Sequence, residues 1–348
     1  MDPVGLLGFP PAHLSRGEAR VLRARTSLGG RPGDHRAGAG VRPVNALFTT
    51  RNRRAAEIAR ALLRFAPTDL TLLLEGETGV GKSFVAARAH RAGRRGRPFV
   101  VVDCGAVPAT LLASALFGHR AGAFTDATRP HRGLLERAAD GTLVLDRVDA
   151  LPSEGQTALL RVLEERSYAP VGAAVPRSFR ARVIALADAG LQQRVDAGTF
   201  RPDLYHRLAG FHAQLPALRH RPEDILPFAR AVLRRGRRQA QGRATLTDEA
   251  GRLLTAYPWP GNFRELEAAL TRARMRGGEG TIGPADLGLP AHAWPAVAGL
   301  AAERMAPLVE VERLYALWVL AAERGNVSRA AAVLGISRRT LIRWRRDE

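Results

Sequence analysis

A glycine-rich stretch with one lysine and one serine has the residue types needed to hold a phosphate chain. Residues 76–83 read Gly-Glu-Thr-Gly-Val-Gly-Lys-Ser and match the pattern G-x-x-x-x-G-K-[ST] without a gap. In such a loop, backbone N–H groups close around the phosphates, Lys82 reaches the β- and γ-phosphates, and the Ser83 hydroxyl is a ligand for Mg²⁺. Lys82 is the only lysine in an arginine-rich chain, which favours a nucleotide site over a chance glycine-rich turn.

The residues around this loop predict the elements that must position it. The apolar run 70–74 suits a strand buried on both faces, and residues 84–90 suit a helix. Further apolar runs at 99–102, 142–145 and 183–186 alternate with helical stretches. This alternation predicts an α/β fold with a parallel sheet.

Asp146 follows one of these predicted strands and is a second candidate for the site. In P-loop proteins, a carboxylate at the end of a neighbouring buried strand orients the water shell of Mg²⁺. Acidic strand ends are common, so the assignment of Ser83 and Asp146 as a metal site depends on the loop itself. The residues of the loop that are expected to contact the nucleotide are Gly76, Glu77, Thr78, Gly79, Val80, Gly81, Lys82 and Ser83.

The composition restricts the class of protein. The 348 residues, 46% of them hydrophobic, suffice for two domains with at least one substantial core. A single cysteine, Cys104, excludes an internal disulfide and a cysteine-rich metal site. With no long apolar run and no signal peptide, we expect a cytoplasmic protein without a membrane partner. The formal charge of +20 favours polyanion partners, although evenly spread arginine can also be a solvated surface.

Changes in composition along the chain suggest its organisation. Residues 1–44 are rich in Gly, Pro and Arg, with one short helical pattern at 17–26, and are expected to form a mostly disordered arm. An amphipathic helix is expected at 51–65. Residues 289–306 are typical of a linker, and residues 307–348 of a compact helical unit.

Four segments resemble, in the same order, motifs of one protein family. Residues 116–127, LFGHRAGAFTDA, are similar to the LFGH-x-x-GAFTGA segment of the bacterial enhancer-binding proteins, the AAA+ activators of sigma-54 RNA polymerase. Residues 200–208, FRPDLYHRL, resemble the family's FR-x-DLYYRL stretch. Residues 215–225, LPALRHRPEDI, and 259–266, WPGNFREL, resemble its LPPLRERREDI and WPGN-x-REL elements. The likeness covers residues 45 to 288.

The resemblance implies an AAA+ fold with a P-loop domain at 45–216 and a helical lid at 217–288. It also implies ATP as the nucleotide, bound with Mg²⁺ at a site shared between subunits of a homo-oligomeric ring, which we expect to be a hexamer. Arg201 and Arg207 of one subunit would then stabilise charge at a neighbour's γ-phosphate as arginine fingers. Arg264 would reach the same phosphates from its own subunit.

The resemblance also implies a protein partner. Phe124 and Thr125 stand where the family has the aromatic residue and threonine that contact the sigma factor of sigma-54 RNA polymerase. Asp126 replaces the second glycine of GAFTGA. An aspartate disfavours the left-handed backbone that a glycine could adopt and adds negative charge, so we expect a weakened contact.

Several positions depart from the family's pattern at the hydrolytic centre. The family's Asp-Glu after the Walker B strand is Asp146-Arg147 here, so a cation replaces the carboxylate that polarises the attacking water. Asp149 could partly substitute for it. The asparagine before the cysteine is Asp103 in this chain, and the sensor I asparagine is Asp188. The sequence therefore supports ATP binding more strongly than ATP hydrolysis.

Residues 307–348 resemble the Fis-type helix-turn-helix that ends many enhancer-binding proteins. The chain contains its G-N-x-S-x-A-A-x-x-L-G-I-S-R-x-T-L pattern. Ser328 is expected to cap the second helix and Ser337 the third, with Gly335 at the turn. The third helix would enter the major groove of double-stranded DNA, although a small lid with a solvated basic face is an alternative. The residues expected at the DNA are Ser337, Arg338, Arg339, Thr340 and Arg343.

The first helix of this unit is expected to bury one apolar face. The residues that helical spacing places on that face are Leu308, Val311, Leu314, Tyr315, Trp318 and Val319.

Two classes of function remain open from the sequence. The first is an ATP-driven motor that binds upstream DNA and remodels sigma-54 polymerase. The second is a nucleotide-responsive DNA-binding regulator that does not hydrolyse ATP efficiently and acts as a repressor, a scaffold or a subunit of mixed rings. Arg147 is the residue that separates them. An AAA+ replication initiator or loader is disfavoured, because it gives no reason for residues 119–127.

Overall fold

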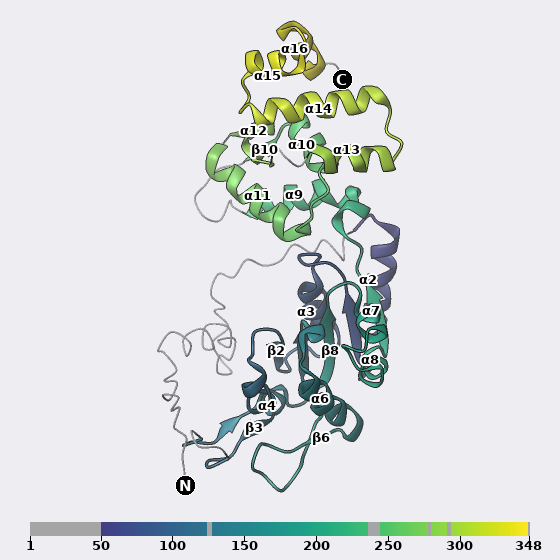
Figure 1. Cartoon of the computed structure of the whole chain (residues 1–348), viewed down its shortest axis with the longest axis vertical. Coiled ribbons are helices and arrows are strands. Elements are labelled where there is room, and N and C mark those ends of the chain that lie inside the picture. Colours follow the sequence, from purple (N-terminus) through teal and green to yellow (C-terminus); the bar gives the residue numbers. More distant parts are fainter. Residues whose placement is uncertain (1–49, 124–126, 236–243, 278–279, 291–293, 347–348) are drawn as a thin grey trace, which may run out of the picture. The chain divides into compact units, whose positions relative to one another are not determined.

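The computed structural model describes residues 50–123, 127–235, 244–277, 280–290 and 294–346 (Figure 1). The arm predicted at 1–44, with its helical pattern at 17–26, lies outside the described residues. Phe124, Thr125 and Asp126 also lie outside them. Within the described ranges, no helix has both the length and the apolar character needed to cross a bilayer.

Five parallel strands form the central sheet. Their spatial order is β2 (Phe99–Asp103), β5 (Thr142–Asp146), β8 (Arg182–Ala187), β1 (Leu72–Glu75) and β9 (Phe211–Gln214). The first four contain the apolar runs expected from the sequence, and their pairing confirms the predicted parallel α/β sheet. The sequence does not predict β9, because this edge strand is not continuously apolar and exposes alternate residues.

The carboxyl ends of these strands meet at one edge of the sheet. Asp103 of β2 lies beside Asp146 of β5, and Glu75 of β1 lies beside Ala187 of β8. Asp188, the next residue, therefore follows β8 at the edge where β1 enters the glycine-rich loop. Ligands of open α/β sheets bind at this edge.

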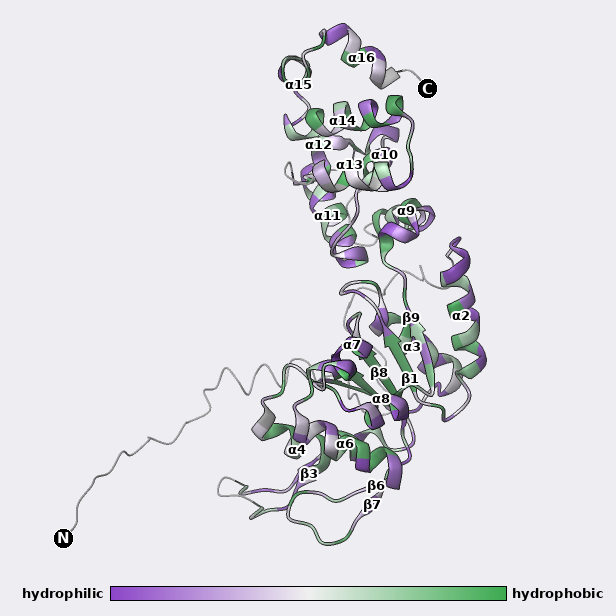
Figure 2. Ribbon diagram, turned by 45° about the vertical axis from the view of Figure 1, so that its right-hand side comes forward, coloured by the Kyte–Doolittle hydropathy of each residue, from purple (hydrophilic) through white to green (hydrophobic). Residues whose placement is uncertain are grey.

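Helices cover both faces of the sheet (Figure 1). Leu73 and Leu143 belong to the core on one face, and Leu72 and Ile184 to the core on the other. Because both faces are covered, the inner strands β5, β8 and β1 consist mainly of buried apolar residues (Figure 2). The first face packs against α4 (Ala109–Phe117), α5 (Leu134–Ala138), α6 (Ser153–Glu165), α7 (Leu191–Asp196) and α8 (Pro202–Leu208), and the second against α2 (Arg53–Phe65) and α3 (Lys82–Gly93).

The sequence explains both ends of α2. Asn52 is its N-cap, and the Asn52 side chain accepts a hydrogen bond from the N–H of Ala55. At the other end, the buried Arg182 of β8 donates to the carbonyl oxygens of Phe65 and Ala66, at 2.9 and 2.6 Å. Burial lowers the pKa of Arg182 to about 10. The helix expected at 51–65 is thus confirmed and is joined to the sheet.

Short elements lie between the longer helices and strands of this part of the chain. Their bounds are β3 (Gly118–His119), β4 (His131–Arg132), η1 (Val148–Ala150), β6 (Ser167–Tyr168) and β7 (Arg177–Ser178). β3 pairs with β4, and β6 with β7, each antiparallel. The pair β3–β4 flanks the segment that resembles the sigma-54 contact.

A second core contains the expected lid. Trp259 is fully buried at its centre, and its Nε1 donates to Leu254 O at 2.7 Å. Helix α13 lies within the segment 289–306 that the sequence suggests is a linker, and its Val297 is buried in this core. The elements here are η2 (Leu218–His220), η3 (Pro222–Asp224), α9 (Ile225–Arg235), β10 (Thr245–Leu246), α10 (Asp248–Ala256), α11 (Asn262–Gly277), β11 (Thr281–Ile282), α12 (Pro284–Leu287) and α13 (Trp294–Glu303).

Three helices complete the chain: α14 (Leu308–Ala322), α15 (Val327–Leu334) and α16 (Arg338–Arg346). Trp318 of α14 belongs to the lid core, whereas Val319 and Leu320 belong to a small core with α15 and α16. The prediction of one apolar face on α14 is correct only in part, because Leu314, Trp318 and Val319 are buried. Leu308, by contrast, is 73% exposed and Tyr315 is 40% exposed. The helix is buried on two sides instead, since it packs against two separate groups of helices.

The helix caps of this unit differ in part from the prediction. Asn326, not Ser328, caps α15, and its side chain accepts the N–H of Arg329 at 3.1 Å. Ser337 caps the start of α16, as expected, by accepting the N–H of Thr340 at 3.0 Å. Gly335 between these helices has a φ of 68°, which suits a glycine at the turn.

Candidate functional site

The loop at 76–83 connects the end of β1 to the first turn of α3. Gly79 and Gly81 have φ angles of 79° and 105°, in the left-handed region that favours glycine. A Cβ on Gly79 would lie 2.2 Å from the carbonyl oxygen of Gly261, so this position also requires glycine for close packing. Gly81 is the N-cap of α3, and no described side chain caps that end. The first turn of α3 thus offers backbone N–H groups to an anion.

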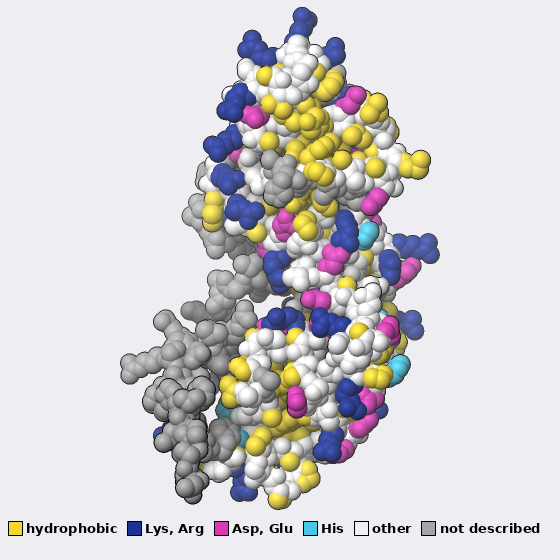
Figure 3. Space-filling view, viewed as in Figure 1, with side chains coloured by type: hydrophobic (Ala, Val, Ile, Leu, Met, Phe, Trp, Pro, Cys, Tyr) yellow, Lys and Arg dark blue, Asp and Glu magenta, His cyan; other side chains and the backbone are white. Residues whose placement is uncertain are grey.

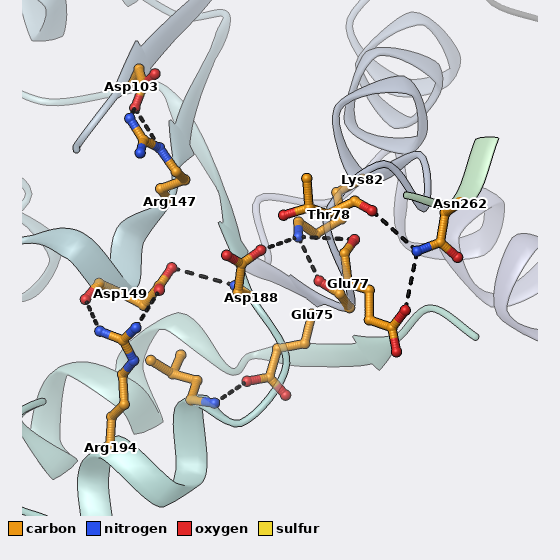
Figure 4. Close-up of polar contacts among 12 residues, drawn as sticks. Glu75, Glu77, Thr78, Lys82, Asp103, Arg147, Asp149, Asp188, Arg194 and Asn262 are labelled. Carbon is orange, nitrogen blue, oxygen red and sulfur yellow. Dashed lines mark hydrogen bonds and ion pairs between the residues drawn. The ribbon is translucent and has the colours of Figure 1, made fainter. Parts of the chain in front are cut away.

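Lys82 lies at the centre of the site with three oxygen acceptors around its ammonium group (Figure 4). Nζ donates to the carbonyl oxygen of Gly76 at 2.5 Å, to that of Glu77 at 3.4 Å, and to Asp188 Oδ1 at 2.8 Å. The lysine is 9% exposed. A buried ammonium needs such partners, because desolvation of an unpaired charge is costly.

Glu77 joins the loop to the lid segment. Arg219 donates two hydrogen bonds to its carboxylate, at 2.6 and 2.9 Å, and these contacts lower the pKa of Glu77. Asn262, at the start of α11, donates to Glu77 and to the carbonyl oxygen of Thr78, both at 3.1 Å. Its Oδ1 accepts the N–H of Leu218. One buried asparagine therefore connects the loop, the chain entering the lid and the lid helix.

Arg219 and Asn262 are site residues that the sequence pattern does not identify as such. Both lie inside segments that resemble family motifs, 215–225 and 259–266. Arg221 of the first segment also contacts the loop, since its Nη2 donates to the carbonyl oxygen of Val80 at 3.0 Å. The motifs were therefore the available signal, but the partners of each side chain required the fold.

Two residues are predicted to hold Mg²⁺. Asp146 is the last residue of β5, and Ser83 lies in the first turn of α3. Burial raises the pKa of Asp146 and the charge of Asp103 raises it further, whereas Lys82 acts to lower it. Among the described residues, no group of three or more His, Cys, Asp and Glu side chains could hold a metal ion.

Arg147, which replaces the expected glutamate, pairs with the other altered residue at this edge, Asp103. Its Nε and Nη2 lie 2.9 and 2.5 Å from Asp103 Oδ1. The guanidinium packs against Gly105, where a Cβ would lie 2.7 Å from Arg147 Cζ. The pair also raises the pKa of Arg147, so the side chain stays a cation. Figure 4 shows Arg147 with Asp103, away from Lys82.

Asp149, the proposed substitute for the missing glutamate, has other partners. Its carboxylate is 3.3 Å from Arg194 Nη2 and accepts the backbone N–H of Asp188 at 3.4 Å. Its side chain is only 6% exposed. These contacts hold the segment after β8 in place, which makes Asp149 a positioning residue for Asp188.

The three candidate arginines lie at the surface. Arg201 precedes α8 and donates two hydrogen bonds to the Asp203 carboxylate. Its Nε lies 3.0 Å from Oδ1 and its Nη2 lies 2.7 Å from Oδ2. Arg207 Nη2 donates to the carbonyl oxygen of Leu163 at 2.9 Å. In the described part of the chain, neither arginine hydrogen-bonds to the loop of its own subunit. Arg264, in the first turn of α11, does approach that loop, since a Cβ on Gly79 would lie 3.1 Å from its Cβ.

The exposed side of α16 carries the residues predicted to contact DNA. Ser337, Arg338, Arg339 and Arg343 are exposed, and Thr340 is half-buried. Leu341, between them, is buried in the core shared with α14 and α15. Basic side chains are visible around α15 and α16 in Figure 3. The helix thus has one packed side and one basic side.

Three family models match consecutive parts of the chain. Residues 48–214 match the sigma-54 interaction domain, and residues 219–295 match the AAA+ ATPase lid domain. Residues 308–346 match the Fis family of bacterial regulatory proteins.

Similar proteins cover most of the chain. The response regulator protein FleR of Pseudomonas aeruginosa is 41% identical over 279 residues, which are 79% of this chain and 57% of FleR. The DNA-binding transcriptional regulator NtrC of Azospirillum brasilense is 35% identical over an alignment of 359 residues, covering 94% of this chain and 74% of NtrC. The chain therefore spans less than two thirds of FleR but more of NtrC.

Solved structures of NtrX from Brucella abortus share the fold and support the same assignment. The complex with ADP has a TM-score of 0.64 and 26% identity, covering 94% of this chain and 71% of NtrX. The complex with ATP has a TM-score of 0.63 and 30% identity, covering 83% and 66%. Together with the three matched models and the similarity to NtrC, these findings show that the chain belongs to the sigma-54-interacting AAA+ family of transcriptional regulators with a Fis-type DNA-binding domain.

Proposed function

We propose that this chain is an ATP- and DNA-binding transcriptional regulator that remodels sigma-54 RNA polymerase as a homo-oligomeric ring, a hexamer by analogy with its family. The observation that carries this proposal is the position of Lys82 at the β1–α3 loop, inside a segment that matches the sigma-54 interaction domain. The complexes of NtrX with ADP and ATP support a nucleotide as the ligand.

The residues at the loop fit a nucleotide. The N-terminus of α3 has no side-chain cap, and Gly79 and Gly81 have the backbone conformations that close a loop around phosphates. Lys82 would contact the β- and γ-phosphates, and Ser83 with Asp146 would hold Mg²⁺. When bound, ATP with Mg²⁺ would supply the free energy of hydrolysis of its terminal phosphate for the remodelling of the polymerase. The chain itself binds and orients the phosphates and, through Asn262 and Glu77, connects them to the lid.

A ring would complete this site from a second subunit. Arg201 and Arg207 are exposed on or beside α8, as residues that act on a neighbouring subunit must be. Arg264 lies beside the loop of its own subunit and would act in cis. The two kinds of arginine would make the site sensitive both to assembly and to lid position.

The second function, a regulator that hydrolyses ATP poorly, is favoured by one observation. The side chain at position 147 is a cation that pairs with Asp103, and the nearby Asp149 pairs with Arg194. Neither position therefore offers a free carboxylate to polarise water. In this form the protein would use bound nucleotide to set its assembly or DNA binding.

The contact with the sigma factor tests the activator proposal. Full-length protein would be incubated with sigma-54 and ADP, ATP or a transition-state analogue, and retained sigma-54 would be measured by pull-down. We expect weak retention in an ATP or transition-state-analogue state, loss in Phe124→Ala, and a gain in Asp126→Gly. If neither wild type nor Asp126→Gly retains sigma-54 with any nucleotide, the activator function is wrong and the second function takes its place.

A further inference from the structure

Asp188 occupies the position on Lys82 at which a phosphate oxygen would be expected. An ammonium group has three N–H donors, and those of Lys82 have three oxygen acceptors. Two of these are backbone carbonyls of the loop itself, from Gly76 and Glu77. The third is the Asp188 carboxylate at 2.8 Å, which is the only one of the three that carries a charge.

The fold places this carboxylate firmly. Asp188 directly follows β8, whose last residue, Ala187, pairs with Glu75 at the end of β1. Its backbone N–H donates to Asp149, which is buried and paired with Arg194. The Asp188 side chain is 46% exposed, so its carboxylate is accessible to solvent while it contacts Lys82. Asp149 thus holds the backbone of Asp188, while the carboxylate of Asp188 contacts Lys82.

Among the described residues, Lys82 is the cation that pairs with Asp188. Arg147, the cation that follows β5 at this edge of the sheet, pairs with Asp103 and not with Asp188. Asp146 lies on the same edge of the sheet and adds a further carboxylate. Like charges at contact distance repel strongly where solvent is partly excluded. A γ-phosphate at Lys82 would therefore lie close to the Asp188 carboxylate, which already accepts a hydrogen bond from the ammonium group.

We propose that Asp188 is a specificity-determining residue that makes this site prefer a nucleoside diphosphate over the triphosphate. Lys82 and the loop N–H groups would contact the β-phosphate of either nucleotide. Only the triphosphate adds a γ-phosphate, which must share the Lys82 donor that Asp188 holds and whose negative charge faces that carboxylate. This inference rests on the proposed nucleotide site. It concerns which phosphate chain binds, so it can fail while nucleotide binding stands.

The test is equilibrium binding by titration calorimetry on the full chain, with ADP and with a non-hydrolysable ATP analogue, each with and without Mg²⁺. Wild type is expected to bind ADP at least about tenfold more tightly than the analogue. Asp188→Asn removes the charge at nearly constant volume. It is expected to tighten the analogue by about tenfold and to change ADP by less than about threefold.

Two further variants separate this effect from general charge and folding effects. Asp188→Glu keeps the charge and is expected to keep the preference for ADP. Asp196→Asn removes an exposed carboxylate at the end of α7, where its partner is Gln192, and is expected to change neither affinity. Thermal unfolding of each variant would establish that it is folded.

The outcomes distinguish the two proposals. Equal affinities in wild type, or a ratio that Asp188→Asn leaves unchanged, would overturn the role of Asp188 and leave the nucleotide site intact. Tighter analogue binding by wild type than by Asp188→Asn with Mg²⁺ would also overturn it, because Asp188 would then act as a ligand for the cation. Absence of binding of both nucleotides to wild type would overturn the nucleotide site itself, and the specificity with it.

Discussion

Arg147 and Asp103, at the ends of two neighbouring strands, form an ion pair in which two guanidinium nitrogens share one carboxylate oxygen. The family resemblance places a glutamate and an asparagine at these two positions. The two departures are thus one paired change, which the absence of a side chain at Gly105 accommodates. The arrangement neutralises a cation beside the nucleotide site, but it leaves no carboxylate at position 147.

The first prediction concerns a double variant that has the family's residues at both positions of this pair. The double variant Asp103→Asn/Arg147→Glu should raise steady-state phosphate release by at least about tenfold over wild type, because a water-polarising carboxylate returns. Arg147→Glu alone should gain less, since it would put a glutamate opposite Asp103 without its asparagine partner. Phosphate release with and without DNA is the measurement. Wild-type turnover already at the level of the double variant would show that another group polarises the water.

The second prediction concerns Lys82. Lys82→Ala removes the one ammonium group of the loop and leaves Asp188 without its partner, so nucleotide affinity should fall by at least about 100-fold. Arg91→Ala, which removes an exposed cation from the far end of the same helix, is the matched control and should leave affinity unchanged. Titration calorimetry with ADP measures both. Equal affinity in Lys82→Ala and wild type would mean that the loop is not the nucleotide site.

The third prediction concerns DNA. Arg343 is exposed on α16, and Arg343→Ala should weaken binding to duplex DNA by about 1–3 kcal/mol if the side chain contacts a base. Arg272→Ala removes an exposed arginine from α11 and serves as the control for net charge. Fluorescence anisotropy at several salt concentrations distinguishes the contacts. A phosphate contact would lower the affinity for all sequences and reduce the salt dependence. No change in any duplex would place the DNA-binding surface elsewhere.

The fourth prediction concerns α14, which contributes to two cores. Trp318 is 4% exposed, and its ring stacks on Tyr257 with centroids 6.1 Å apart. Trp318→Ala should cost about 3–5 kcal/mol of stability, because it leaves a cavity in the lid core. Tyr315→Ala, at a 40% exposed position on the same helix, should cost much less.

Hydrogen exchange measures how far the effect of Trp318→Ala spreads. Since α14 also packs against α15 and α16 through Val319 and Leu320, protection should fall both in α10 and in α15. Loss of protection confined to α10 would show that the two groups of helices unfold independently.

The local pattern alone was enough to predict the phosphate-binding loop with the strand before it and the helix after it. A strand, a glycine-rich turn and a helix follow one another within residues 70–90, so their arrangement depends on neighbours in the sequence. The predicted cap at Ser337 is likewise local, because its side chain accepts an N–H three residues ahead. These features required no knowledge of the tertiary structure.

The tertiary structure decided which charged groups meet. Lys82 and Asp188 are 106 positions apart, and Arg147 and Asp103 are 44 apart. Each pair forms only because the strands lie parallel in the order β2-β5-β8-β1-β9, which brings their carboxyl ends to one edge. The same holds for α14, whose sequence shows an apolar helix but not that Trp318 and Val319 face different cores. Periodicity identifies apolar positions, whereas the packing of distant segments determines what covers them.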